Sequence, residues 1–164
     1  MRLPAFFSVT MLAATAAASA QTDVYYVERG YWTIMGMASR CIAVNRPVAD
    51  FNAAPYNALE ISAWPKSAIS VDVFFWPGAV TPEREYQLQL YFSAGDLTLP
   101  AKPTIGDYAL ASDPDMGLWR KLQDSKTLGV AVVGEPALAT SFTLDGIDWV
   151  IDALTACSGM LPKE

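Results

Sequence analysis

Regular alternation of apolar and polar side chains over residues 86–92 is the feature of this sequence that most restricts its fold. Every second residue from Tyr86 to Phe92 is apolar, while Gln87 and Gln89 occupy the positions between them. Successive side chains of a β-strand point to opposite faces, so this pattern predicts a strand with one buried face. The chain must therefore build a sheet whose apolar face is covered.

Other segments show strand-like alternation or a high density of β-branched and aromatic residues, bounded by glycine and proline. We expect two opening strands within residues 25–34 and 40–45, with breaks at Gly30 and Gly36. Residues 59–63 and 69–75 predict a hairpin that turns at residues 65–67. Shorter or later strands are expected at residues 97–99, 106–111, 128–133 and 138–144, and residues 128–133 are apolar enough to be covered on both faces.

Two helices interrupt the strands. Asp113 followed by Pro114 is typical of a helix start, which predicts a short helix over residues 114–125. A terminal helix is expected to begin at Asp145, to bury an apolar stripe that includes Ile151 and Leu154, and to end at Gly159. The fold class predicted is α+β and β-rich, an antiparallel sheet or sandwich with a short internal helix and a C-terminal amphipathic helix.

The beginning of the chain has the pattern of a secretory signal peptide. Arg2 precedes an uncharged apolar stretch, and Ala18-Ser19-Ala20 has the small residues that a signal peptidase requires. We predict that residues 1–20 are a signal peptide cleaved before Gln21, and that residues 21–164 form a single β-rich globular domain. The expected location is periplasmic or secreted, with no stable membrane insertion after cleavage.

The charge balance argues against nucleic acid as a partner. The sequence has 11 Lys and Arg against 17 Asp and Glu, for a net charge of −6. Arg2 is the one charged residue among the first twenty, so their removal makes the net charge −7. Binding to phosphate backbones requires clustered cations, and the cations here are scattered.

Two cysteines are present, Cys41 and Cys157. An exported protein meets oxidising conditions, which favour their pairing. We therefore predict a disulfide that joins the opening sheet to the terminal helix, whose buried stripe Cys157 continues. Two free buried thiols are the alternative.

Most catalytic chemistry is missing from the sequence. It contains no histidine, which excludes the Ser-His-Asp and Cys-His mechanisms. No cofactor motif or metal-ligand pattern is present, so no cofactor is expected. Carboxylates could still support a hydrolase acting on cell-envelope glycan, and the strand region contains Glu60, Asp72, Glu83 and Glu85. We expect these four to be solvated residues between buried neighbours.

Four aromatic residues fall opposite the strongest inward-facing stripes: Trp64, Phe74, Trp76 and Tyr91. They either belong to a second buried face of the sheet or form an exposed binding patch. An exposed patch would suit a protein, peptide or glycan partner, or a small ligand.

Several segments together resemble the invasion-associated locus B family of small exported alphaproteobacterial proteins. The resemblance covers most of the chain after residue 20 and rests on Trp32, on residues 39–43, 118–122, 127–130 and 142–147, and on Ala153-Leu154 with Cys157. It implies a periplasmic or surface β-rich protein without known catalytic residues. The function predicted is non-enzymatic binding at the cell envelope, with the glycan hydrolase and the small-ligand binder as alternatives.

Overall fold

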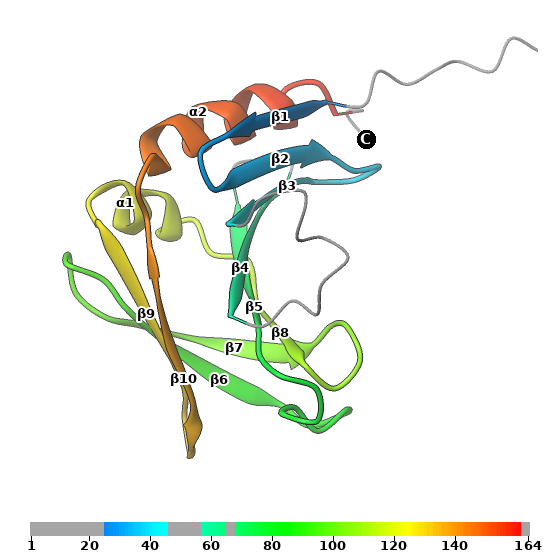
Figure 1. Cartoon of the computed structure of the whole chain (residues 1–164), viewed down its shortest axis with the longest axis vertical. Helices are drawn as coiled ribbons and strands as arrows, with labels where there is room; N and C mark the ends of the chain where they lie inside the picture. The colour runs from blue at the N-terminus through cyan, green and yellow to red at the C-terminus, as the bar shows by residue number, and fades with distance from the viewer. Residues whose placement is uncertain (1–24, 46–56, 65–67, 162–164) are drawn as a thin grey trace, which may run out of the picture.

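The structure is a computed structural model that describes residues 25–45, 57–64 and 68–161 (Figure 1). The predicted signal peptide and the turn at residues 65–67 lie outside the described residues. Within them the chain forms ten strands and two helices. In chain order these are β1 (Tyr26–Arg29), β2 (Trp32–Gly36), β3 (Cys41–Asn45), β4 (Ala58–Ala63), β5 (Ile69–Phe74), β6 (Tyr86–Tyr91), β7 (Leu97–Pro103), β8 (Ala109–Ser112), α1 (Leu118–Gln123), β9 (Thr127–Val132), β10 (Glu135–Thr143) and α2 (Ile147–Ser158).

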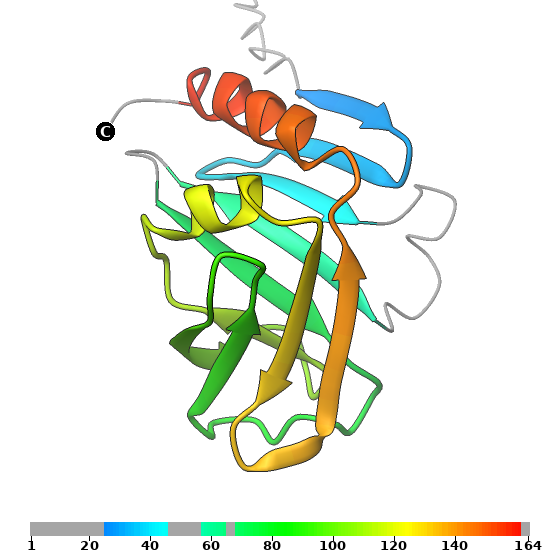
Figure 2. The same ribbon diagram turned by 90° about the vertical axis from the view of Figure 1, so that its left-hand side faces the viewer.

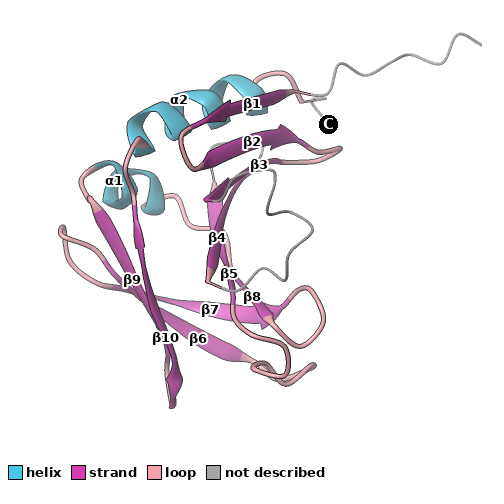
Figure 3. Cartoon of the chain, viewed as in Figure 1, coloured by secondary structure: helices cyan, strands magenta, loops and turns pink. Residues whose placement is uncertain are grey.

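All ten strands belong to one antiparallel sheet, which confirms the predicted fold class (Figure 3). Their order is β1-β2-β3-β4-β5-β8-β7-β6-β9-β10. The first five strands follow the chain, and then β8, β7 and β6 follow in reverse order. The sheet curves strongly, so that β4 and β5 lie across the interior from β9 and β10 (Figures 1 and 2).

The opening of the chain contains three strands, so the prediction of two was wrong. Gly30 has a positive φ of 63°, and it turns the chain between Arg29 and Trp32, which pair across β1 and β2. Glycine adopts this backbone conformation without the steric penalty of a Cβ atom. The turn therefore divides the aromatic segment into a hairpin.

The internal helix is shorter than predicted and Asp113 does not cap it. The backbone N–H of Asp115 donates to the carbonyl of Ile69 at 2.7 Å, and the Asp115 carboxylate accepts from the N–H of Gly117. These bonds hold residues 115–117 against β5 in a turn, so the helix begins only at Leu118.

The terminal helix α2 begins at Ile147 and has no side-chain cap at its start. The predicted cap by Asp145 is therefore wrong, because Gly146, in a left-handed conformation with φ 80°, is the residue that precedes the first helical turn. The end at Gly159 and the buried stripe are as predicted. Among the described residues, neither this helix nor α1 is long and apolar enough to cross a membrane.

One large apolar core fills the inside of the curved sheet, and α1 and α2 close it (Figure 2). Both helices and the nine strands from β2 to β10 supply its side chains, among them Leu88, Leu118 and Leu154. The β9 segment contributes only alternate residues, so the prediction that both of its faces are covered was wrong: Val133 is exposed.

Candidate functional site

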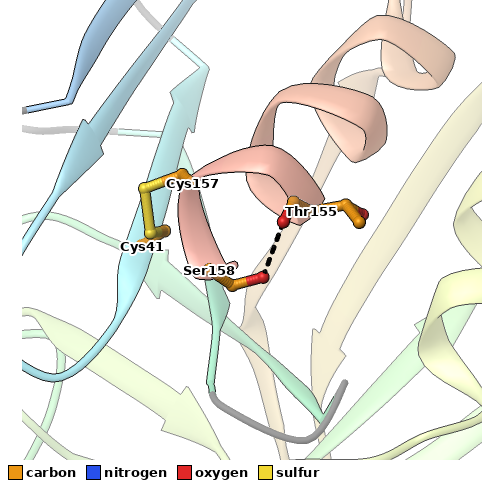
Figure 4. The surroundings of a disulfide bond; sticks show 4 residues. All are labelled: Cys41, Thr155, Cys157 and Ser158. Carbon is orange, nitrogen blue, oxygen red and sulfur yellow. Dashed lines mark hydrogen bonds between the residues drawn. A yellow bond between two sulfur atoms is a disulfide. The ribbon is translucent and has the colours of Figure 1, made fainter. Parts of the chain in front are cut away.

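A disulfide joins Cys41, the first residue of β3, to Cys157 in the last turn of α2 (Figure 4). The two Cα atoms are 6.1 Å apart and both cysteines are buried. This confirms the predicted pairing and excludes free thiols at these positions. Beside the bond, the Ser158 hydroxyl donates to the carbonyl of Thr155 at 3.0 Å and satisfies an acceptor at the helix end.

Strands β4 and β5 have a second buried face, on the side away from the large core. Glu60 lies directly opposite Asp72, and Ser62 lies directly opposite Ser70. All four residues are buried, with exposed fractions of 7% for Glu60 and 2% for Asp72. We call these four residues the buried polar row. Side chains in such opposite positions start from Cβ atoms about 5 Å apart, so the two carboxyl groups are close neighbours.

Arg40 provides the positive charge at this row. Its Nη2 lies 3.5 Å from Oε1 of Glu60, and the Ser62 hydroxyl donates to the same oxygen at 3.2 Å. The guanidinium carbon also lies 5.3 Å from the centre of the Trp64 ring, in a cation–π arrangement. Trp64 in turn donates from Nε1 to the Ser70 hydroxyl at 3.3 Å. Arg40 is thus held between Glu60 and an aromatic ring.

Burial changes the acidity of both carboxyl groups. Loss of solvation raises the pKa of Glu60, while the charge of Arg40 and the bond from Ser62 act in the opposite direction. Loss of solvation also raises the pKa of Asp72, to about 7; the charge of Glu60 adds to this rise and that of Arg40 opposes it. Within the described residues, Oδ1 of Asp72 has no hydrogen-bond partner.

The prediction that all four strand-region acids are solvated was therefore wrong for Glu60 and Asp72. Glu83 and Glu85 are exposed, as expected. Alternation correctly placed Glu60 and Asp72 opposite the core, but it cannot show whether that outer face meets water. The serines at positions 62 and 70 were the available signal, because small hydroxyl side chains next to a carboxylate suit a buried polar layer.

The four aromatic residues are spread over the molecule. Trp64 lies over one end of the buried polar row and Phe74 lies at the other end, buried against Tyr108 with ring centres 6.4 Å apart. Trp76, just past the far end of β5, is 44% exposed. Tyr91 is 39% exposed on β6, where it packs against Gly129 of β9 and is separated from β5 by two strands. They do not meet in one surface patch.

A separate open cleft of about 430 Å³ lies beside the pair of strands β6 and β7. Its lining includes both positive and negative side chains together with exposed apolar surface from Val133. The lining residues are Arg84, Glu85, Tyr86, Gln87, Pro100, Ala101, Lys102, Asp113 and Val133. At the rim, Arg84 pairs with Glu135 at 2.7 Å and lies over the ring of Tyr86.

The carboxylates with raised pKa and the cleft do not coincide. Glu60 and Asp72 are absent from the lining, and at 7% and 2% exposure they offer no access to a sugar ring. The acids that do line the cleft are Glu85 and Asp113. Among the described residues, no group of three or more histidine, cysteine, aspartate or glutamate side chains is arranged to hold a metal ion.

Comparison with known proteins adds a structural relative. No protein-family model and no curated protein matches the sequence. The fold is similar to the crystal structure of invasion associated protein B from Bartonella henselae, with a TM-score of 0.58 and 18% sequence identity. The match covers 82% of this chain and 99% of that chain. At this level of identity the likeness establishes a shared fold.

Proposed function

We propose that this protein is a non-enzymatic binding protein of the bacterial cell envelope, periplasmic or secreted, whose mature chain from Gln21 forms one domain. The observation that carries the proposal is the buried Cys41–Cys157 disulfide. Such bonds form and persist in oxidising compartments and are rare in the cytosol. An export signal at the start of the sequence and a disulfide in the fold are mutually consistent.

The shared fold supports an envelope role. The Bartonella henselae protein of similar fold is named invasion associated protein B. The segments around Trp32 and Cys41 resemble the invasion-associated locus B family of exported proteins. Fold likeness does not transfer function by itself, so the binding role rests on the surface of this chain.

The cleft beside β6 and β7 is the surface that we assign to the partner. Its volume of about 430 Å³ is open to one side, and it offers Lys102 and Arg84 together with Glu85 and Asp113. A mixed-charge lining suits the polar, two-signed surface of a protein or peptide better than an apolar small molecule. Val133, 52% exposed, supplies an apolar contact at the same place.

Export can be tested by expressing the full chain in a Gram-negative host and separating periplasm, membrane and cytosol. Each fraction is treated with a thiol-alkylating reagent of known mass before and after reduction. We expect periplasmic or secreted protein that begins at Gln21 and gains two labels only after reduction. Full-length protein that stays in the cytosol with both cysteines free would contradict the proposal.

Binding can be tested by placing a photo-crosslinking residue at Gln87 or Val133, which are exposed on the cleft, and at Asp152, which is exposed on α2. The three variants are irradiated in envelope preparations. We expect one discrete adduct, identified by mass spectrometry, from both cleft positions and not from Asp152. Equal labelling from all three positions, or from none, would reject the cleft as the binding surface.

The absence of catalysis can be tested on the same material. Purified protein is incubated with peptidoglycan, and soluble fragments are measured by chromatography, with Glu85→Gln/Asp113→Asn as the matched variant. We expect no release above background from either protein. Release by the parent chain that the double substitution abolishes would establish a carboxylate-dependent hydrolase instead.

A further inference from the structure

The buried polar row has an unusual charge count. Glu60 and Asp72 would each bear a negative charge if both were ionised, and Arg40 supplies one positive charge. The buried cluster would then have a net charge of −1. It becomes neutral when one proton is bound between the two acids, so the folded structure favours that state.

In the part of the chain that the structure describes, the other elements around Asp72 do not supply the missing positive charge. Ala109 and Ala111 of β8 pair with β5 and have no charge. Lys102 of β7 lies opposite Ala111 on the other side of β8 from Asp72, and its side chain is exposed to solvent. On the opposite face of β5, α1 presents buried leucines. Glu60 and Arg40 are therefore the charged groups, among the described residues, that act on Asp72 at close range.

The two acids differ in how they are satisfied. Glu60 accepts bonds from Arg40 and Ser62. Asp72, with 2% exposure, has an oxygen that no described residue bonds. An ionised carboxylate in that position would share the single charge of Arg40 with Glu60 and would leave Oδ1 without a donor from any described residue, whereas the protonated form is neutral and needs fewer donors. The proton therefore belongs mainly on Asp72.

We propose that Glu60 and Asp72 form a pH-sensitive switch in the fold, in which release of one proton loosens the outer face of β4 and β5. Water must reach Asp72 before its charge can be stabilised, and at 2% exposure this requires the face to open. Mildly acidic surroundings keep the face closed, and alkaline surroundings open it. The switch is independent of the binding role proposed above.

The direction in which stability changes with pH follows from proton linkage. The pKa of Asp72 is about 7 in the folded protein against 3.8 for an ordinary aspartate, so the folded state holds the extra proton between these values. The stability contributed by this group is complete below pH 3.8, falls as pH rises from there through about 7, and is lost and constant at higher pH. Between pH 5 and pH 8, the Asp72 contribution to the folding equilibrium constant falls on the order of 100-fold.

The test compares the parent chain with Asp72→Asn, which keeps the shape of the side chain and removes the titration. Urea unfolding at pH 5 and pH 8 gives the ratio of folding equilibrium constants of the variant and the parent. We expect this ratio to rise on the order of 100-fold from pH 5 to pH 8. Asp152→Asn, an exposed position on α2, is the matched control and should show a constant ratio. A constant ratio for Asp72→Asn as well would overturn the proposal.

A second measurement covers the case in which Asp72→Asn fails to fold. Carbon-13 NMR of the aspartate carboxyl carbons in the parent chain follows each titration directly, and amide hydrogen exchange reports opening of β4 and β5. We expect one aspartate to titrate near neutral pH, together with faster exchange in β4 and β5 than in β6 as pH rises, after correction for intrinsic exchange rates. Aspartates that all titrate below pH ~5, near the ordinary value, would overturn the proposal.

Discussion

Loss of the Cys41–Cys157 disulfide is expected to lower the free energy of unfolding without abolishing the fold. The bond closes a loop with a sequence separation of 116 residues. In the chain-entropy model, opening a loop of this length raises the entropy of the unfolded state by an amount that lowers stability by about 4.8 kcal/mol at 25 °C. This is a third or more of the roughly 5 to 15 kcal/mol that typically separates folded from unfolded states.

The folded state should survive because the elements joined by the bond also pack together. α2 lies against β2 and β3 and buries Val150, Ile151 and Leu154 in the core. Those contacts do not depend on the sulfur–sulfur bond. The reduced protein is therefore expected to be a less stable version of the same structure, with an unchanged far-ultraviolet circular dichroism spectrum.

Urea unfolding of oxidised and reduced protein, followed by tryptophan fluorescence, measures this difference. With a typical urea slope of about 2 kcal/mol per molar, the midpoint should fall by about 2 to 2.5 M on reduction. Cys41→Ala should unfold near the reduced midpoint without any reductant, since it cannot form the bond. The Cys41→Ala substitution should lower the free energy of unfolding only slightly beyond the loss of the bond itself, because it removes only one buried sulfur.

Two outcomes would refute this reasoning. A midpoint that moves by less than about 0.5 M, or about 1 kcal/mol, would show that the crosslink does not restrict the unfolded chain as the entropy model requires. A reduced protein with no cooperative transition would show that the bond, and not the packing of α2, holds the terminal helix in place.

Three further changes test the packing, the backbone and the surface. Leu154→Ala should lower stability by about 2 to 5 kcal/mol in urea unfolding, because this fully buried side chain would leave a cavity in the core; a loss below 1 kcal/mol would contradict its place there. Gly146→Ala should cost about 1 kcal/mol because φ is 80°, while Gly159→Ala, where φ is −66°, should be close to neutral in thermal unfolding; equal effects would reject the conformational argument. Arg84→Gln breaks the partly exposed pair with Glu135 and should change stability by less than about 1 kcal/mol, with a smaller effect in high salt; a larger, salt-independent loss would contradict this.

Strands that depend on local pattern were predictable from the residues alone. The alternation over residues 86–92 corresponds to β6, and the two halves of the predicted hairpin pair as β4 and β5. A two-residue period is a property of the extended backbone itself, so it is visible without knowing what lies next to the strand. The disulfide was predictable for a similar reason, since a chain with two cysteines allows only one pairing within itself.

The environment of the outer face was not predictable in this way. Alternation placed Glu60 and Asp72 on the side away from the core, and the structure agrees. Whether that side meets water depends on tertiary contacts, such as that of Arg40 with Glu60, which alternation does not encode. The same limit applies to the start of α1, where a backbone bond from Asp115 to Ile69 overrides the local preference of Asp113-Pro114.

Sequence pattern thus established the strand periodicity, the buried stripe of α2 and the cysteine pairing, because each follows from neighbours along the chain or from composition. Tertiary structure decided that β5 pairs with β8 and β6 with β9, and that two acids share one buried face with a single arginine. These outcomes depend on which surfaces the curved sheet brings together. Contacts between distant segments lower the free energy only after the chain has closed the loops between them, and no local pattern encodes that balance.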